Sequence, residues 1–214
     1  LKNLSIRKIY NPTFIAERKI DIEKVKQLKE RYGDYLLMVG RFTKEKDQRT
    51  VICAGKILRE RYNIERKILF LGDGPEKYNI EKFAEKEDMN DLVIFEGNQI
   101  DVQNYYAAAK ILVHSSPAEG LPTVLLEAMN FGVPIVATNS LPGVPEILEG
   151  EKDGMVCDVK DATGMAEKIY TLLTDEIIYK KYSELGKSRI KSFRPDYVRK
   201  QLEEYFEEIR QNEK

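Results

Sequence analysis

Six short hydrophobic runs recur along the chain, and none of them alternates strictly with polar residues. Runs of this kind are typical of strands that are buried on both faces of a sheet. Segments with the apolar spacing of helices separate most of the runs. This alternation of strands and helices predicts a parallel sheet covered by helices on both sides. The runs lie at 35–40, 67–71, 92–95, 111–113, 134–137 and 155–157.

Helices are expected before, between and after these runs. Asp21 can cap the first helix and Gly33 can end it. Residues 6–10 are expected to form a short leading strand, ended by the turn signal of an Asn-Pro pair. Near the end of the chain, Pro195 should interrupt the last helical stretch. The expected helices are 21–32, 48–62, 76–88, 102–109, 123–131, 144–148, 162–174, 176–191 and 197–211.

The sequence therefore predicts an α/β protein, with a Rossmann-like three-layer domain, a parallel sheet of about six strands and additional C-terminal helices. Residues 1–33 would form the leading strand, linker and helix, residues 34–174 the core, and residues 175–214 the C-terminal helices. A chain of 214 residues suffices for one substantial α/β domain. Because the sequence does not begin with methionine, we expect it to be a piece of a longer protein.

Composition narrows the class of protein. A net charge of −1 gives no overall attraction to nucleic acid or to an anionic membrane. No apolar run is long enough for a transmembrane helix, and no signal peptide is visible. Cys53 and Cys157 stand far apart in mostly apolar runs, which favours buried free thiols over a disulfide or a metal site. Free thiols fit a reducing compartment, so we expect a cytoplasmic protein.

The stretch 115–129 is where a predicted strand breaks into small polar residues and restarts as a helix. Pro122 suits the first helical position, where its missing N–H is no loss. The unpaired amides at such a helix start attract anions, above all phosphate. Glu119 precedes the helix, and Glu127 shares a helical face with Thr123. Two carboxylates therefore bracket a predicted anion site.

Further polar residues follow the other predicted strands, and the ends of parallel strands share one edge where ligands bind. Gly40, Arg41 and Lys46 follow the first strand, whereas Gly72 and Gly74 follow the second. The cations and the helix start suit a diphosphate. Ionised carboxylates only accept hydrogen bonds, so they suit the hydroxyls of a sugar. Together these residues indicate a nucleotide sugar or a similar ligand.

Other kinds of site fit the sequence less well. The Gly-x-Gly pair at 72–74 lacks the third glycine of a dinucleotide-binding loop, and no GxxxxGK[ST] loop is present. His114, the only histidine, is expected to pack near the rim rather than to act as a base. No Cys/His cluster or Asp-x-Asp pair suggests a metal, and the serines at 115 and 116 lack a hydrolase elbow.

Several motifs resemble one known family. The segment EGLPTVLLEAMNFGVPIVAT, which contains Glu119 and Glu127, is similar to the signature of glycogen-synthase-like retaining glycosyltransferases with the GT-B fold. The segments VGRFTKEK at 39–46, LGDGP at 71–75 and GVPEIL at 143–148 agree with that family in order and spacing, as does the strand and helix at 93–109. Each motif alone is weak, but five in order are highly specific.

The resemblance implies that the chain is the C-terminal, donor-binding half of a two-domain enzyme, without the N-terminal acceptor domain. Arg41, Lys46 and Glu119 would be catalytic: the two cations would grip the donor diphosphate, and Glu119 would contact sugar hydroxyls. Glu127 would hold the ribose hydroxyls. The donor-binding set expected from the rim and the resemblance also includes Gly40, Gly72, Gly74, Asn98, Gln99, Ile100, Gly120, Leu121, Pro122 and Thr123.

The implied reaction is transfer of a hexosyl or N-acetylhexosaminyl group from a UDP- or GDP-linked sugar to a glycan, lipid or polysaccharide, with retained anomeric configuration. It needs no metal and no cofactor beyond the donor substrate. The fragment would bind donor but be inactive alone, and the parent protein could associate peripherally with the inner membrane face. A non-catalytic partner subunit with this fold and a sugar-nucleotide epimerase remain alternatives. The sequence departs from the family at Gln48, Arg49 and Lys110.

Overall fold

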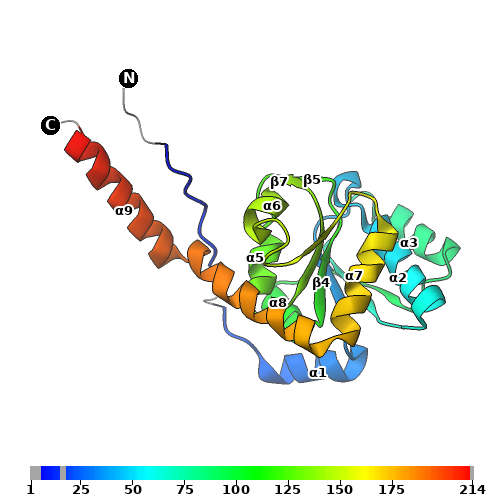
Figure 1. The fold of residues 1–214 in the computed structure, drawn as a ribbon. Coiled ribbons are helices and arrows are strands. Elements are labelled where there is room, and N and C mark those ends of the chain that lie inside the picture. The colour runs from blue at the N-terminus through cyan, green and yellow to red at the C-terminus, as the bar shows by residue number, and fades with distance from the viewer. Residues whose placement is uncertain (1–5, 15–17, 213–214) are drawn as a thin grey trace.

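Six parallel strands form the central sheet of this computed structural model, which describes residues 6–14 and 18–212 (Figure 1). Each strand coincides with one of the predicted hydrophobic runs, so the prediction of a parallel sheet of about six strands is confirmed. The order across the sheet is β3-β2-β1-β4-β6-β8. These strands are β1 (Leu36–Val39), β2 (Ile68–Leu71), β3 (Val93–Gly97), β4 (Ile111–His114), β6 (Ile135–Thr138) and β8 (Met155–Cys157).

Successive residues of each strand enter two different hydrophobic cores, because side chains alternate across a strand. Leu37 and Leu112 lie in one core, whereas their neighbours Met38 and Val113 lie in the other. The first core is covered by α1 (Ile22–Tyr32), α4 (Val102–Ala108), α5 (Thr123–Asn130) and α6 (Gly143–Leu148). The second is covered by α2 (Gln48–Tyr62), α3 (Lys77–Lys86) and α7 (Ala162–Thr174). The three-layer arrangement is therefore confirmed.

The predicted helices agree with the observed ones to within two residues at each end, which is the usual uncertainty of helix boundaries. Asp21 caps α1 by accepting a hydrogen bond from the Lys24 amide, and Gly33 ends it. At the carboxyl end of the chain, α8 (Glu176–Arg189) passes through the 3-10 turn η3 (Ile190–Phe193) into α9 (Pro195–Asn212). Pro195 separates the two helices, as predicted, by beginning the second one.

Residues 6–10 do not form the predicted leading strand. They run beside α9, away from the sheet, where no strand of the described chain is available to pair with them (Figure 1). Arg7 bonds Glu208 and lies 3.9 Å from Glu204, both on α9. The Tyr10 ring packs on Phe193, with 5.0 Å between centroids. The mixed apolar and polar pattern of this segment therefore serves packing against a helix.

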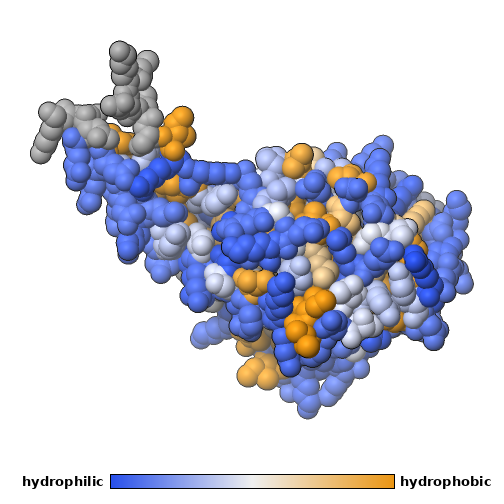
Figure 2. Space-filling view, in the orientation of Figure 1, coloured by the Kyte–Doolittle hydropathy of each residue, from blue (hydrophilic) through white to orange (hydrophobic). Residues whose placement is uncertain are grey.

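The last helix projects from the body of the domain as an arm (Figure 1). Val198, in its first turn, is buried, whereas Phe206 further out is 57% exposed. Figure 2 shows mostly hydrophilic residues along this arm, with a few hydrophobic ones at its outer part, where the amino-terminal segment also lies. The apolar side of this helix is therefore buried on the domain at its beginning and remains partly open beyond it.

Two further strands were missed from the sequence. They are β5 (Ala118–Glu119) and β7 (Leu141–Pro142), which pair in parallel as a small ribbon separate from the main sheet. The ribbon joins the loop after β4 to the loop after β6. It thereby fixes the backbone that carries Glu119.

Both cysteines are free thiols, as predicted. Cys157 is buried, and burial raises the pKa of its thiol to about 12. Cys53 is half-buried, and burial raises the pKa of its thiol as well. In the part of the chain that the structure describes, no helix has the length and apolar character needed to cross a membrane.

Candidate functional site

The carboxyl ends of β1, β2 and β3 open onto a cavity of about 210 Å³. Gly40 and Arg41 reach it from β1, Gly72 from β2, and Asn98 and Gln99 from the loop after β3. Apolar side chains from the strand ends and from α4 complete its wall. An apolar wall with a few polar groups is typical of small-molecule sites. The structure thus brings four of the predicted donor-binding residues together with Arg41, which was predicted to be catalytic, from three separate loops.

Glycines allow the loops after β1 and β2 to lie against each other. Gly72 has a φ of +135°, and a β-carbon there would lie 2.1 Å from the Gly40 carbonyl oxygen. A β-carbon on Gly74 would lie 2.5 Å from the Phe42 carbonyl oxygen. Residues with a side chain cannot adopt this arrangement without displacing the backbone. The Gly-x-Gly spacing therefore serves loop packing at the wall of the cavity.

Lys46 reaches across the rim to Glu119, with 2.5 Å between Nζ and Oε1. It belongs to the 3-10 turn η2 (Lys44–Lys46), and its aliphatic stem runs over Gly40. The two side chains are 28% and 16% exposed, so this pair is partly shielded from water. Burial alone would raise the pKa of Glu119, but the Lys46 ammonium holds that pKa below its ordinary value. Glu119 is therefore ionised at neutral pH.

Ser115 fixes the turn that carries Lys46 through contacts of its hydroxyl with the backbone. The Ser115 hydroxyl lies 2.9 Å from the Lys46 carbonyl oxygen and 2.8 Å from that of Asp47. Ser115 is completely buried directly after β4. A buried hydroxyl bonded to backbone fixes the position of that backbone. The first and fourth strand ends are therefore joined at the point where the ion pair forms.

His114 lies at the end of β4 beside the same carboxylate. Its Nε2 is 3.6 Å from the nearest Glu119 oxygen and has no hydrogen-bond partner in the described part of the chain. Burial lowers the pKa of His114 to about 4, although Glu119 acts in the opposite direction. The imidazole is therefore neutral at pH 7 and packs near the rim, where the sequence analysis placed it.

This burial makes the stability of the protein depend on pH. Between pH 7 and pH 5 the free energy of unfolding should fall by about 2 kcal/mol. A histidine in the unfolded chain has a pKa of 6.5 and gains a proton in this range, whereas folded His114, with a pKa of about 4, does not. Extra protons bound to the unfolded state stabilise that state. Urea denaturation at the two pH values measures the difference.

The control for this prediction is His114→Leu. Since the sequence contains one histidine, this variant should lose most of the stability change between pH 7 and pH 5. An undiminished change in the variant would show that carboxylates, and not His114, cause the pH dependence.

The helix after Glu119 begins at Thr123, as the expected range 123–131 stated, although Pro122 was also considered for its first helical position. Pro122 is the N-cap of α5 and not its first helical residue. No side chain caps the amides of the first turn, and Thr123 is exposed there. Such an end favours an anion, because several amides point outward and the helix dipole is positive at this end.

A second loop packs tightly against this helix start. A β-carbon on Gly143 would lie 2.6 Å from the Gly120 carbonyl oxygen and 2.7 Å from Pro122 Cδ. The β5–β7 ribbon also pairs Glu119 with Pro142. The loops after β4 and β6 therefore form one packed unit that presents Glu119 and the helix start together.

Glu127, on the second turn of α5, accepts a hydrogen bond of 2.7 Å from the Tyr106 hydroxyl. Tyr106 is fully buried in α4, and its burial, followed by the charge of Glu127, raises its pKa well above the ordinary value. Tyr106 is therefore a neutral donor that orients the carboxylate. The sequence analysis missed this residue, because a tyrosine on an apolar helix face is more often part of the core.

Ile100 and Leu121 are two further predicted residues that do not line the cavity. Ile100 is 93% exposed and does not line the cavity beside Asn98 and Gln99. Leu121 is half-buried and packs against the core beneath α5. Among the described residues, no group of three or more His, Cys, Asp and Glu side chains is arranged to hold a metal ion.

Comparison with known proteins shows which family the sequence matches. The model of the family described as glycosyl transferases group 1 matches residues 19–189. The N-acetyl-alpha-D-glucosaminyl L-malate synthase of Bacillus anthracis is 32% identical over 219 residues, which cover 99% of this chain and 56% of that protein. An uncharacterized glycosyltransferase of Haemophilus influenzae is 32% identical over 171 residues, covering 79% of this chain and 47% of that protein. The chain thus spans about half the length of these curated relatives.

A solved structure shows the same fold. HepE of Anabaena, determined in complex with UDP, superposes with a TM-score of 0.82 at 20% sequence identity. The match covers 94% of this chain and 57% of HepE.

Proposed function

Because the chain belongs to the group 1 glycosyltransferases and has the Rossmann-like architecture of one half of a GT-B fold, we propose that it is the donor-binding half of a retaining, metal-independent glycosyltransferase. It would take a hexosyl or N-acetylhexosaminyl group from a UDP- or GDP-linked sugar. The acceptor would be a glycan, a lipid or a polysaccharide. The observation that carries this proposal is the contact of 2.5 Å between Lys46 and Glu119 at the edge of the sheet where Arg41 also lies.

Each group at this edge has a role in the proposal. Arg41, Lys46 and the uncapped start of α5 would hold the diphosphate and stabilise the charge that develops on the leaving phosphate. Glu119 would accept hydrogen bonds from the hydroxyls of the transferred sugar. Glu127, oriented by Tyr106, would accept hydrogen bonds from the ribose. The cavity at the ends of β1 to β3 would take the nucleotide base.

The division of labour in the parent protein is part of the same proposal. Residues 34–174 would bind the donor, with residues 1–33 and 175–214 as flanking elements, and an acceptor-binding half would lie outside this chain. That the chain spans 56% of its Bacillus anthracis relative supports this division. The isolated chain would then bind donor without transferring sugar. The parent protein would act in the cytoplasm, peripherally at the inner face of the membrane.

Calorimetric titration of the isolated chain with UDP and with GDP tests this function. We expect binding of at least one nucleotide, weakened at least about tenfold by Arg41→Ala, because a charged hydrogen bond to phosphate is lost. Arg61→Ala is the matched control, since Arg61 lies on α2 outside the cavity and contacts Glu167 instead. Absence of binding by both nucleotides, or equal affinity in the Arg41 variant, would remove the diphosphate assignment.

A further inference from the structure

A second cavity, of about 370 Å³, lies apart from the site described above. It forms where the amino-terminal ends of α2 and α3 meet the loops that follow β4 and β8. Its volume is within the range of about 300–1,000 Å³ that is typical of small-molecule sites. No residue lines both this cavity and the cavity at Gly40 and Gly72. The two cavities could therefore be occupied at the same time.

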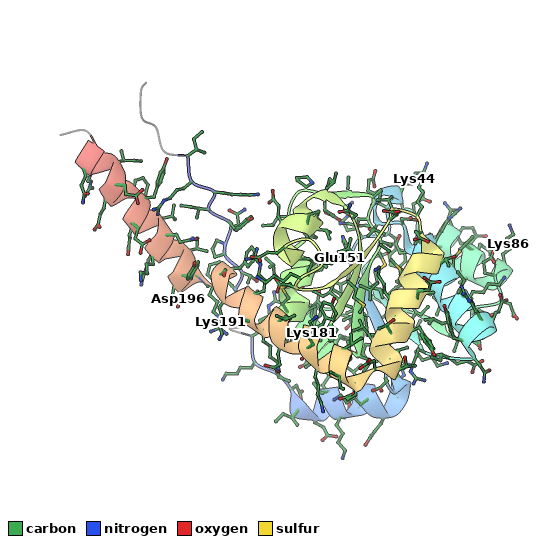
Figure 3. The ribbon with its side chains drawn as sticks, viewed as in Figure 1. Lys44, Lys86, Glu151, Lys181, Lys191 and Asp196 are labelled. Carbon is green, nitrogen blue, oxygen red and sulfur yellow. The ribbon has the colours of Figure 1, made fainter. Side chains whose placement is uncertain are left out.

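Three cations border this second cavity: Lys44 from η2, Arg49 from α2, and Lys160 from the loop before α7. Within the described part of the chain, none of them forms an ion pair with a carboxylate. Figure 3 places Lys44 at the edge of the molecule, close to the amino-terminal end of α7. These three cations outnumber the two carboxylates that also line the cavity, Asp47 and Glu76, so the net charge of the lining is positive and favours an anionic ligand.

Gln48 provides a second and independent observation in this cavity. The residue is 1% exposed and lines the cavity. Its Nε2 donates a hydrogen bond of 3.0 Å to the Arg41 carbonyl oxygen, which fixes the orientation of the amide. Its Oε1 is buried without a partner in the described part of the chain. An acceptor in this position requires a donor, such as a hydroxyl of a ligand.

The amino-terminal end of α2 is a further feature of this cavity, beside the three cations and Gln48. Asp47 is the N-cap of this helix, but its side chain makes no capping hydrogen bond to the helix amides. It accepts instead from the Thr50 hydroxyl, at 2.7 Å. The positive end of a fifteen-residue helix therefore remains directed at the cavity. The carboxylates of Asp47 and Glu76, which also line it, are acceptors for hydroxyls.

We propose that this cavity binds a small phosphorylated polyol, such as a sugar phosphate. The phosphate would lie among Lys44, Arg49 and Lys160, and the hydroxyls would donate to Gln48 Oε1 and the neighbouring carboxylates. The segment 43–48 separates this cavity from the Lys46–Glu119 pair. The two sites are therefore expected to bind their ligands independently. The proposal concerns binding and does not depend on the transfer reaction.

Calorimetric titration with glucose 6-phosphate, with and without saturating UDP, tests this proposal. We expect the dissociation constant to be unchanged by UDP, and we expect inorganic phosphate and glucose each to bind at least tenfold more weakly. The double variant Lys44→Gln and Lys160→Gln should weaken glucose 6-phosphate at least about tenfold, because two charged hydrogen bonds are lost. Lys86→Gln, at the far end of α3 (Figure 3), should have no effect.

Each opposite result would overturn the assignment. Competition between UDP and glucose 6-phosphate would place the phosphate in the first site and remove the second. Equal affinity for inorganic phosphate would remove the polyol. No measurable binding at millimolar glucose 6-phosphate, or full affinity in the double variant, would remove the site itself. If UDP fails to bind at all, the titrations without UDP still measure whether glucose 6-phosphate binds the second cavity. The proposed donor site and the proposed second site can therefore be rejected independently of each other.

Discussion

Lys46→Met is expected to lower the rate of sugar transfer by about 10²–10³-fold in a protein that contains both the donor and the acceptor halves. In the proposed reaction the Lys46 ammonium stabilises the charge on the leaving phosphate. Methionine keeps the aliphatic stem that lies over Gly40 but lacks the charge. The loss should therefore appear in kcat as well as in kcat/KM. Steady-state kinetics with a nucleotide sugar and its acceptor measure both.

A matched control for this prediction is Lys56→Met. Lys56 forms a similar, partly shielded ion pair with Glu87, 3.0 Å apart, between α2 and α3 and outside both cavities. Its loss should leave the rate within about twofold, because no substrate charge lies there. If the two variants lost activity equally, Lys46 would act through stability. The double variant Lys46→Met and Glu119→Gln separates the effects further through stability, since its free energy of unfolding should exceed that of Lys46→Met once the unpaired carboxylate is removed.

Gly72→Ala is expected to destabilise the chain by about 4 kcal/mol, near the upper end of single-residue effects. The added methyl group would lie 2.1 Å from the Gly40 carbonyl oxygen, and the φ of +135° is unfavourable for alanine. The loops after β1 and β2 would have to separate, which would also open the first cavity. Urea denaturation followed by circular dichroism measures the loss of stability.

Gly150→Ala separates crowding from backbone strain. Gly150 also has a positive φ, of +75°, but a β-carbon there would meet nothing within 4 Å. Its replacement should cost only about 1 kcal/mol, the usual penalty of the left-handed region for alanine. Equal losses in the two variants would show that close contact with Gly40 contributes nothing. A fall in soluble yield confined to the Gly72 variant would agree with the prediction.

Most of the sheet could be predicted from the sequence, because strands buried on both faces appear as unbroken hydrophobic runs. The β5–β7 ribbon could not, since two residues per strand leave no pattern to detect. Residues 6–10 were assigned wrongly, because a short segment of mixed apolar and polar residues fits a strand and a helix-packing peptide equally well. In the structure this segment packs beside α9, where Arg7 pairs with Glu208, and not beside a strand.

For the candidate site, the sequence predicts which residues follow the strand ends at one rim, but not how those residues contact one another. Strand ends in a parallel sheet share an edge, so Arg41, Lys46 and Glu119 could be assigned to one rim. The contact between Lys46 and Glu119, which are 73 residues apart, depends on how the loops pack. The same is true of Tyr106 beside Glu127. The second cavity was not foreseen at all, because it gathers residues from several loops that carry no common motif.

The contact between Lys46 and Glu119 also bears on the thermodynamics of donor binding. In the empty protein each of these charges already has a counterion, so in the proposed function an arriving nucleotide sugar would exchange partners with an existing pair. Replacing one charged hydrogen bond by another yields little net enthalpy. We therefore expect the heat of association to be small and the affinity modest. Modest affinity favours rapid release of the spent nucleotide, which every turnover requires.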